Sequence, residues 1–445
     1  MKMNKSSVKQ ILVVCLVMVL LNFACSRHDV PEKGRETERP VATEIQGESG
    51  SETRTTHSGT AENIPAEPGP ADRLVRAINQ FAFDLYSHIK TEESGNVFYS
   101  PFSLSVAMAM TYEGARGQTA DEIRQVFHYP ADIELLRLGF SEILSRVNQK
   151  DRKYELRTAN ALWAQQGYPF LPEYFQTLEK YYSGRLTAVD FVKETEKSRQ
   201  TINRWVEEQT NNRIRDLIPM NVITTLTRLV LTNAIYFKGL WEIQFPKKDT
   251  READFRVSAD KMVRVPMMFL QDAEVNYFET EDLQLIELPY AGGEISMLVL
   301  LPGDDLSRIE PYLSPEKLAE LRARLTGKEK VDIYLPRFRL ETKYLMGGED
   351  GLLGRMGMPT AFTLGADLSG LTGRKELRIT EVVHQAFVEV NEEGTEAAAA
   401  TAVVIGIKMV LKKPVFRADH PFIFIIQERQ SGTILFMGRV INPGR

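Results

Sequence analysis

Disulfide bonds are excluded from the folded part of this chain, because cysteine is missing there. The 445-residue sequence has two cysteines, Cys15 and Cys25, and both lie in its first 25 residues. A domain without disulfides must be stabilised by its own core, which requires a long chain. Hydrophobic residues make up 43% of the sequence, and no internal repeat or second linker divides residues 71–445. We therefore expect one large domain over residues 71–445.

Motifs of enzymes and metal sites are also missing. Of the six histidines, four lie in residues 71–445, and the sequence has no His-Glu-x-x-His, no Gly-x-Ser-x-Gly and no phosphate-binding loop. Ser87 and Lys90 have the spacing of one serine-acylase motif, but the partner motifs of that chemistry are absent. An exposed patch on an amphipathic helix accounts for this pair. We expect no catalysis, no metal ion and no cofactor.

An excess of positive charge is absent as well. The net charge is −5, and this value includes +3 from Lys2, Lys5 and Lys9, so the chain without them carries about −8. The basic residues are scattered and form no stripe. This charge disfavours nucleic acid as a partner, and we expect none.

The first residues are typical of an export signal. Three lysines precede an apolar stretch at 11–24, whose 14 residues are fewer than the roughly 20 that span a bilayer as a helix. Residues 24–26, Ala-Cys-Ser, resemble a bacterial lipoprotein processing site, in which Cys25 becomes the lipidated first residue. The alternative is an ordinary signal peptide cleaved nearby. We expect residues 1–25 to be a signal, and the protein to be anchored at the cell envelope or otherwise secreted.

The next segment, residues 26–70, predicts a disordered tether. Residues 27–70 have no aromatic side chain and are rich in Glu, Thr, Ser, Gly and Pro, so they cannot bury enough apolar surface to fold. A flexible chain of this length has an r.m.s. span of about 35–40 Å. Such a tether holds a folded domain clear of a membrane surface.

The most informative segment runs from Gly394 to Lys408. Small residues come first, then β-branched ones without charge at 397–407, and then the single cation Lys408. Taken alone, the uncharged run could be a buried helix or a core strand, since periodicity does not distinguish short apolar runs. The flanks favour an exposed loop: alternation over 379–390 predicts a strand before it, and residues 419–426 and 433–440 predict two strands after it.

Five segments in order resemble the serpin family of protease inhibitors: NVFYSPFSLS at 96–105, TNAIYFKGLW at 232–241, ADLSG at 366–370, EEGTEAAAAT at 392–401 and DHPF at 419–422. The resemblance covers roughly residues 71–443. It implies an α+β fold with a large, mostly antiparallel central sheet, additional sheets, surrounding helices and an exposed reactive-centre loop. It also implies a monomer whose partners are serine proteases, with cysteine proteases as a further class.

The resemblance also implies site residues. A cluster of buried polar residues, the "shutter", would lie under the sheet and act mechanically rather than as a catalytic group. Trp241 would mark the "breach", the place where the loop first enters the sheet; the alternative is a plain core tryptophan. The hinge is expected at Glu392, Gly394, Thr395, Glu396, Ala397, Ala398, Ala399, Ala400 and Thr401, and the shutter at Ser100, Ser103, Asn233 and His384.

The family places the residue before the cut fourteen positions after the hinge glycine, which implies a reactive bond between Lys408 and Met409. The stretch from Lys408 to the 421 proline is slightly long for the family, so cleavage at Ile407, Met409 or Lys412 stays open. A lysine at the cut favours trypsin-like proteases, whose specificity pocket carries an anion.

The implied mechanism is suicide inhibition. The protease attacks the carbonyl of Lys408 and forms an acyl-enzyme, and the cut loop then inserts into the central sheet as a new strand. Thr395, Ala397, Ala399, Thr401 and Val403 would face inward, and the alternate positions could face solvent. Two alternatives remain open: a non-inhibitory serpin that binds through its surface or loop, and an adhesion lipoprotein that only keeps the scaffold.

One segment departs from the family pattern. Residues 346–351 contain three glycines in six positions where the family usually has a short helix. Glycine is unfavourable in helices, so we expect a loop or a broken helix there.

Overall fold

The computed structural model describes residues 68–148, 153–395 and 413–444. These residues form helices and two sheets, which confirms the predicted α+β class. The first described helix, α2, begins at Pro70 with Gly69 as its N-cap, one residue before the expected start of the domain. None of the helices in these ranges is long and apolar enough to cross a membrane.

The six-stranded sheet carries the segments singled out by the sequence. Its strand order is β10-β11-β12-β4-β2-β3, and most neighbours are antiparallel. The predicted strand at 379–390 is observed as β11. The strands are β10 (Phe338–Leu345), β11 (Glu381–Asn391), β12 (Gly394–Thr395), β4 (Leu229–Leu240), β2 (Tyr154–Gln165) and β3 (Arg185–Val189).

The nine-stranded sheet holds the C-terminal strands. Its order is β1-β15-β14-β8-β7-β6-β9-β13, with β5 paired to β6. The two strands predicted after the loop are observed as β14 and β15. The strands are β1 (Val97–Tyr99), β5 (Arg251–Ser258), β6 (Lys261–Glu279), β7 (Leu283–Pro289), β8 (Ile295–Pro302), β9 (Lys328–Pro336), β13 (Val415–Arg417), β14 (Phe422–Glu428) and β15 (Ile434–Val440).

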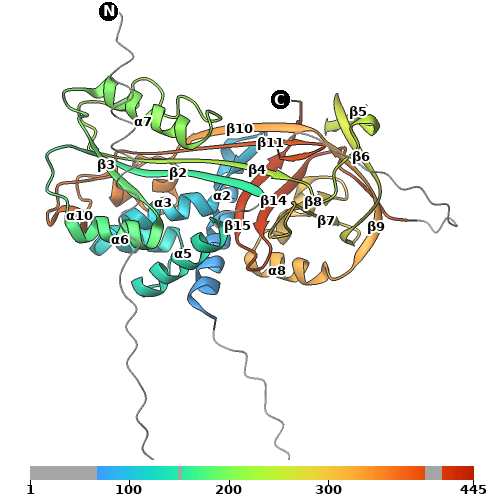
Figure 1. The fold of residues 1–445 in the computed structure, drawn as a ribbon, viewed down its shortest axis with the longest axis horizontal. Helices are drawn as coiled ribbons and strands as arrows, with labels where there is room; N and C mark the ends of the chain where they lie inside the picture. Colours follow the sequence, from blue (N-terminus) through green and yellow to red (C-terminus); the bar gives the residue numbers. More distant parts are fainter. Residues whose placement is uncertain (1–67, 149–152, 396–412, 445) are drawn as a thin grey trace, which may run out of the picture. The chain divides into compact units, whose positions relative to one another are not determined.

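Helices cover both faces of the six-stranded sheet. Figure 1 shows α7 along one face and α3, α5 and α6 beneath the other. The helices are α2 (Pro70–Glu92), α3 (Pro101–Gly114), α4 (Gly117–Val126), α5 (Ile133–Val147), α6 (Pro172–Tyr182), α7 (Thr195–Gln209), α8 (Pro315–Arg324), α9 (Leu352–Arg355) and α10 (Ser369–Thr372). Short 3-10 turns occur at Lys247–Asp249, Leu306–Arg308, Glu310–Tyr312 and Pro359–Phe362.

The core has two parts. The larger cluster includes residues of α2, α3 and α5, of the six-stranded sheet and of the nine-stranded sheet. The smaller one lies on the opposite face of the six-stranded sheet, where Ile202 and Val206 of α7 pack with Tyr236 of β4 and Phe387 of β11. Any strand added between β4 and β11 would therefore have apolar neighbours on both faces.

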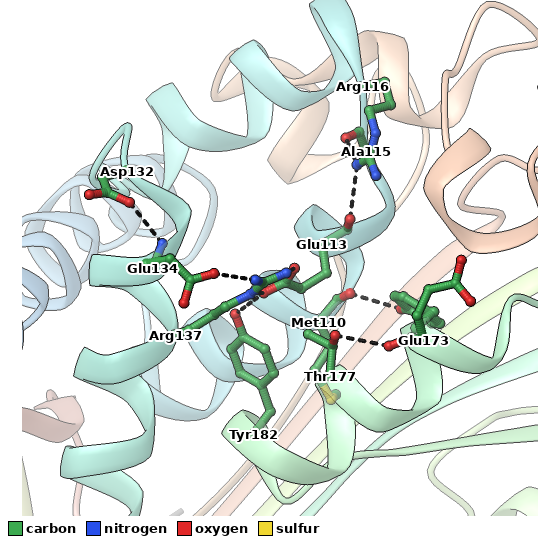
Figure 2. A network of polar contacts seen from close by, with 11 residues as sticks. Met110, Glu113, Ala115, Arg116, Asp132, Glu134, Arg137, Glu173, Thr177 and Tyr182 are labelled. Carbon is green, nitrogen blue, oxygen red and sulfur yellow. Dashed lines mark hydrogen bonds and ion pairs between the residues drawn. The ribbon is translucent and has the colours of Figure 1, made fainter.

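A buried ion pair joins the helices beneath the sheet (Figure 2). The Glu113 carboxylate at the end of α3 is 3% exposed and accepts hydrogen bonds from Arg137 Nε at 2.9 Å and Nη2 at 2.7 Å. Tyr182 of α6 donates a third hydrogen bond at 2.7 Å. Because the buried carboxylate is paired and hydrogen-bonded, it ties α5 and α6 to α3 without leaving an unmet charge.

The glycine-rich segment 346–351 is irregular, and a single turn of helix, α9, follows it. A Cβ on Gly347 would lie 2.5 Å from Glu381 Oε1 and 2.8 Å from the Glu381 Cα, and Gly348 has a φ of +97°. The chain can turn back against the start of β11 only with glycine at these places. The prediction of a loop or broken helix is confirmed.

Candidate functional site: the seam between β4 and β11

A parallel seam runs through the middle of the six-stranded sheet. β11 and β4 pair in parallel over seven residue pairs, from Glu381 opposite Val230 to Phe387 opposite Tyr236. A parallel ladder is slightly less stable per residue than an antiparallel one. A strand inserted antiparallel to both neighbours would replace this one ladder with two of the more stable kind.

The hinge already occupies the top of this seam. Gly394 and Thr395 form β12, with Thr395 opposite both Gly239 of β4 and Val390 of β11. Gly394 has a φ of +144°, and a Cβ on it would lie 2.1 Å from the Gly239 carbonyl oxygen. Glycine is therefore required where the chain turns into the sheet.

Aromatic side chains surround the first inserted residue. Thr395 is 1% exposed, and its hydroxyl lies 2.9 Å from the Tyr290 hydroxyl. Trp241 stacks on Tyr290 with ring centroids 4.5 Å apart, and its indole nitrogen donates to the Asn391 carbonyl at 2.9 Å. Trp241 therefore lies at the entrance of the seam, and its role as the breach stays a prediction.

An ion pair with a buried carboxylate holds Glu392, two residues before the hinge glycine Gly394. Glu392 has a side chain only 2% exposed, and Arg337 Nε lies 2.8 Å from both of its carboxylate oxygens. Thr250 donates a further hydrogen bond at 2.5 Å. Burial by itself would raise the pKa of Glu392, but the hydrogen bonds from Arg337 and Thr250 outweigh it, so this pKa lies below its ordinary value.

Arg337→Met is expected to destabilise the protein by about 2–3 kcal/mol, since the Glu392 carboxylate would stay buried without its cation. The midpoint of urea unfolding measures this loss. Arg339→Met is the matched control, because Arg339 lies two residues further on, is 61% exposed and pairs with an exposed glutamate. An equal loss in both variants would contradict the assignment of the Glu392 pair.

The four residues predicted as the shutter lie together below the seam. Ser100 donates from its backbone N to His384 Nε2 at 3.1 Å and from its hydroxyl to the Leu435 carbonyl at 2.6 Å. The other ring nitrogen of His384 contacts Asn233 Oδ1, and Asn233 Nδ2 donates to the Ser103 hydroxyl at 2.6 Å. His384 and Asn233 are fully buried and are opposite each other across the seam.

The sequence analysis missed one member of this cluster. Asn160 of β2 is directly opposite Asn233, and it accepts hydrogen bonds from Asn233 Nδ2 at 2.6 Å and from the Ser103 hydroxyl at 2.9 Å. Asn160, Asn233 and His384 thus form one polar row across β2, β4 and β11. An asparagine among the apolar residues of 159–164 was the available signal.

The cluster lacks the geometry of a catalytic triad. His384 Nε2 accepts a hydrogen bond from the Ser100 backbone N, so the ring proton lies on Nδ1 and points to the Asn233 amide oxygen. Neither serine hydroxyl donates to the ring. Burial lowers the pKa of His384 to about 3, so the ring is neutral at physiological pH. No cluster of residues able to hold a metal ion occurs in the three described ranges.

Acidification is expected to destabilise the protein through His384. The folded-state pKa of about 3 lies below the ordinary value of 6.5, so between these pH values the unfolded chain binds the extra proton and stability falls as pH falls. From pH 7.5 to 5.0 this contribution is about 2 kcal/mol. The free energy of unfolding, measured in urea at both pH values, should fall less on acidification in His384→Gln than in the unmodified protein, by that amount. An equal fall in both proteins would mean that His384 is not buried in its neutral form.

Several predicted residues lie outside the described ranges. These are Glu396, Ala397, Ala398, Ala399, Ala400 and Thr401 of the hinge, the bond between Lys408 and Met409 with its alternatives, and Cys25. The remaining hinge, breach and shutter residues lie along one seam. Tyr290 and Arg337 join them, and nothing in the sequence motifs pointed to either.

Comparisons with known proteins agree with this arrangement. The family model "Serpin (serine protease inhibitor)" matches residues 76–443. A serpin-like protein of Thermococcus kodakarensis is 42% identical over 97% of this chain and 98% of its own length. Human leukocyte elastase inhibitor is 40% identical over 84% of this chain and its full length.

Solved structures agree as well. Serpin48 of the insect Tenebrio molitor has a TM-score of 0.73 and 34% identity, covering 86% of this chain and 100% of that one. Uncleaved ovalbumin has a TM-score of 0.73 and 33% identity, and the match covers 83% of this chain and 100% of the ovalbumin chain. The chain is thus similar in sequence to serpin-like proteins and in fold to solved serpin structures. It belongs to the serpin family of serine protease inhibitors.

Proposed function

We propose that this protein traps trypsin-like serine proteases covalently after they cleave the bond between Lys408 and Met409. In the first step the protease serine attacks the Lys408 carbonyl, the amide bond breaks, and the new amine of Met409 leaves with a proton. Lys408 stays bound to the protease as an ester. The observation that carries the proposal is the position of Gly394 and Thr395, which already pair with both strands of the seam.

The register of β12 supports continued insertion. Counting onward from Thr395, residue 397 comes opposite Phe237 and residue 401 comes opposite Asn233 on one side and His384 on the other. Thr401 would then stand between the two polar residues that now contact each other. Its hydroxyl can both donate and accept, so it can replace the contact that insertion breaks.

The same counting explains why four consecutive alanines follow Glu396. Residue 398 would come between Tyr236 and Phe387, whose rings now lie 6.4 Å apart in the apolar cluster beneath α7. After insertion the alternate positions would therefore lie against this apolar cluster. Small side chains are needed on both faces of the inserted strand.

The free energy gained by inserting the loop into the sheet is sufficient to hold a protease. About a dozen new ladder hydrogen bonds at ~1 kcal/mol net each give on the order of 10 kcal/mol. A domain's whole stability is typically about 5–15 kcal/mol, so this gain is large enough to distort the protease and stall deacylation. The stretch from Gly394 to Lys408 reaches about 46–50 Å when extended, the scale needed to carry a protease along the domain.

Lys408 supports a trypsin-like target. The human relative's name refers to elastase, but the cation counted as the cleavage residue here fits a protease pocket that carries an anion. Cysteine proteases are a further class of partner. The N-terminal pattern supports export, with cleavage that leaves Cys25 as the lipidated first residue and membrane anchor and with residues 26–70 as the tether of the domain. The protein acts as a monomer.

Mixing the purified protein with trypsin tests the proposal. A denaturing gel should show a stable band at the summed mass, and mass spectrometry should show a released C-terminal fragment that begins at Met409. Clean cleavage without that band, also with elastase-like and subtilisin-like enzymes, would instead favour a non-inhibitory serpin that binds through its surface.

A further inference from the structure

Lys413, the first residue described after the loop, is held by two aspartates. Its Nζ lies 2.7 Å from Asp272 Oδ1 and 2.8 Å from Asp332 Oδ1. The hydrogen bonds to Asp272 and Asp332 raise the pKa of Lys413. Lys413 is one third exposed, Asp332 is 17% exposed and Asp272 is 52% exposed, so the contact with Asp332 is the better shielded of the two.

A bulge in β6 brings the two aspartates together. The β6–β9 register shifts between Leu270 and Ala273, and Asp272 has a φ of +51°. The Asp272 backbone N donates to Asp332 Oδ1 at 3.0 Å, which positions the second carboxylate. A bulge of this kind turns a side chain out of the regular alternation of its strand, and here it directs Asp272 toward Lys413.

The residues after Lys413 are also fixed. The Pro414 carbonyl accepts from the Asp332 backbone N at 3.1 Å, and Val415 is opposite Asp332 where β13 pairs with β9. Gln284 donates to the Val415 carbonyl at 3.2 Å. Three consecutive residues, 413–415, are therefore attached to the body of the protein.

We propose that Asp272 and Asp332 form a lysine anchor that selects the reactive bond, directing proteases to Lys408 and away from Lys412. This inference rests on the proposed function. A protease binds residues on both sides of the bond that it cleaves, in an extended conformation. If the bond after Lys412 were cut, the residues beyond it would be Lys413, Pro414 and Val415, and all three are attached to the body of the protein. At Lys408 four residues, 409–412, separate the bond from the anchor.

Brief digestion with trypsin, followed by the masses of the C-terminal fragments, tests the anchor. In the unmodified protein the fragment beginning at Met409 should dominate over the one beginning at Lys413. In the double variant Asp272→Asn, Asp332→Asn the share of the second fragment should rise about tenfold. Asp272→Asn alone, which keeps the backbone contact at the bulge, should give an intermediate rise.

Glu274→Gln is the matched control. Glu274 pairs with Lys330 across the same two strands at 3.6 Å, with both side chains more than 60% exposed, and its loss should leave the fragment ratio unchanged. Equal cleavage at Lys412 and Lys408 in the unmodified protein would overturn the anchor, and so would an unchanged ratio in the double variant. If the ratio shifts but no covalent complex forms with any protease, the anchor stands and the proposed inhibition fails.

Discussion

Thr395→Arg is expected to turn the protein from an inhibitor into a substrate. Thr395 is 1% exposed and contacts the Tyr290 hydroxyl, so an arginine there would bring an unpaired charge into a packed aromatic site. Burial of a charge costs several kcal/mol, and each 1.4 kcal/mol of this penalty should slow insertion by a factor of ten. Insertion should then be slower than deacylation, and the cut inhibitor should be released.

The number of inhibitor molecules consumed per trypsin molecule measures this outcome. It should rise at least about tenfold, while the fragment beginning at Met409 still appears. Thr395→Ser keeps the hydroxyl near Tyr290 and serves as the control, with inhibition close to that of the unmodified protein. A full yield of covalent complex from Thr395→Arg would rule out insertion through the seam between β4 and β11.

Lys408→Glu is expected to abolish inhibition of trypsin. The substitution places a negative charge against the anion of the trypsin pocket, and such like-charge contacts cost several kcal/mol. The second-order rate constant of inhibition should fall by about 10³-fold or more. Lys408→Arg keeps the charge and should inhibit normally.

Retained inhibition by Lys408→Glu would move the reactive bond to another residue. Lys412 is then the first to examine, and the fragment masses distinguish it directly from Lys408. Because residues 413–415 are attached to β9 and β7, we expect cleavage at Lys412 to remain minor in this variant as well.

Much of the site follows from local composition. The alternation at 379–390 is a strand pattern, and β11 lies where that alternation predicted it. The shutter serines flank the start of α3, where Ser100 caps the helix by accepting from the Ser103 backbone N. That cap needs no distant partner, so the sequence alone could predict it.

Other residues could not be assigned from sequence. Asn160 became part of the shutter through the pairing of β2 with β4, and Arg337 reaches Glu392 from 55 residues away. Neither strand register nor the direction of a loop side chain is encoded in a short motif. Both contacts depend on strands that pair only once the chain has folded.

The sequence by itself determined the family, the composition of the loop and the position of Lys408 relative to the hinge glycine, because these depend on residue types and counting along the chain. The tertiary structure alone decided that Thr395 is seated in a parallel seam before any cleavage, and that a bulge in β6 brings Asp272 to Lys413 from 141 residues away. The physical reason is that burial and ion pairing depend on which strands become neighbours. Those neighbours are set by the packing of two whole sheets and no single segment encodes them.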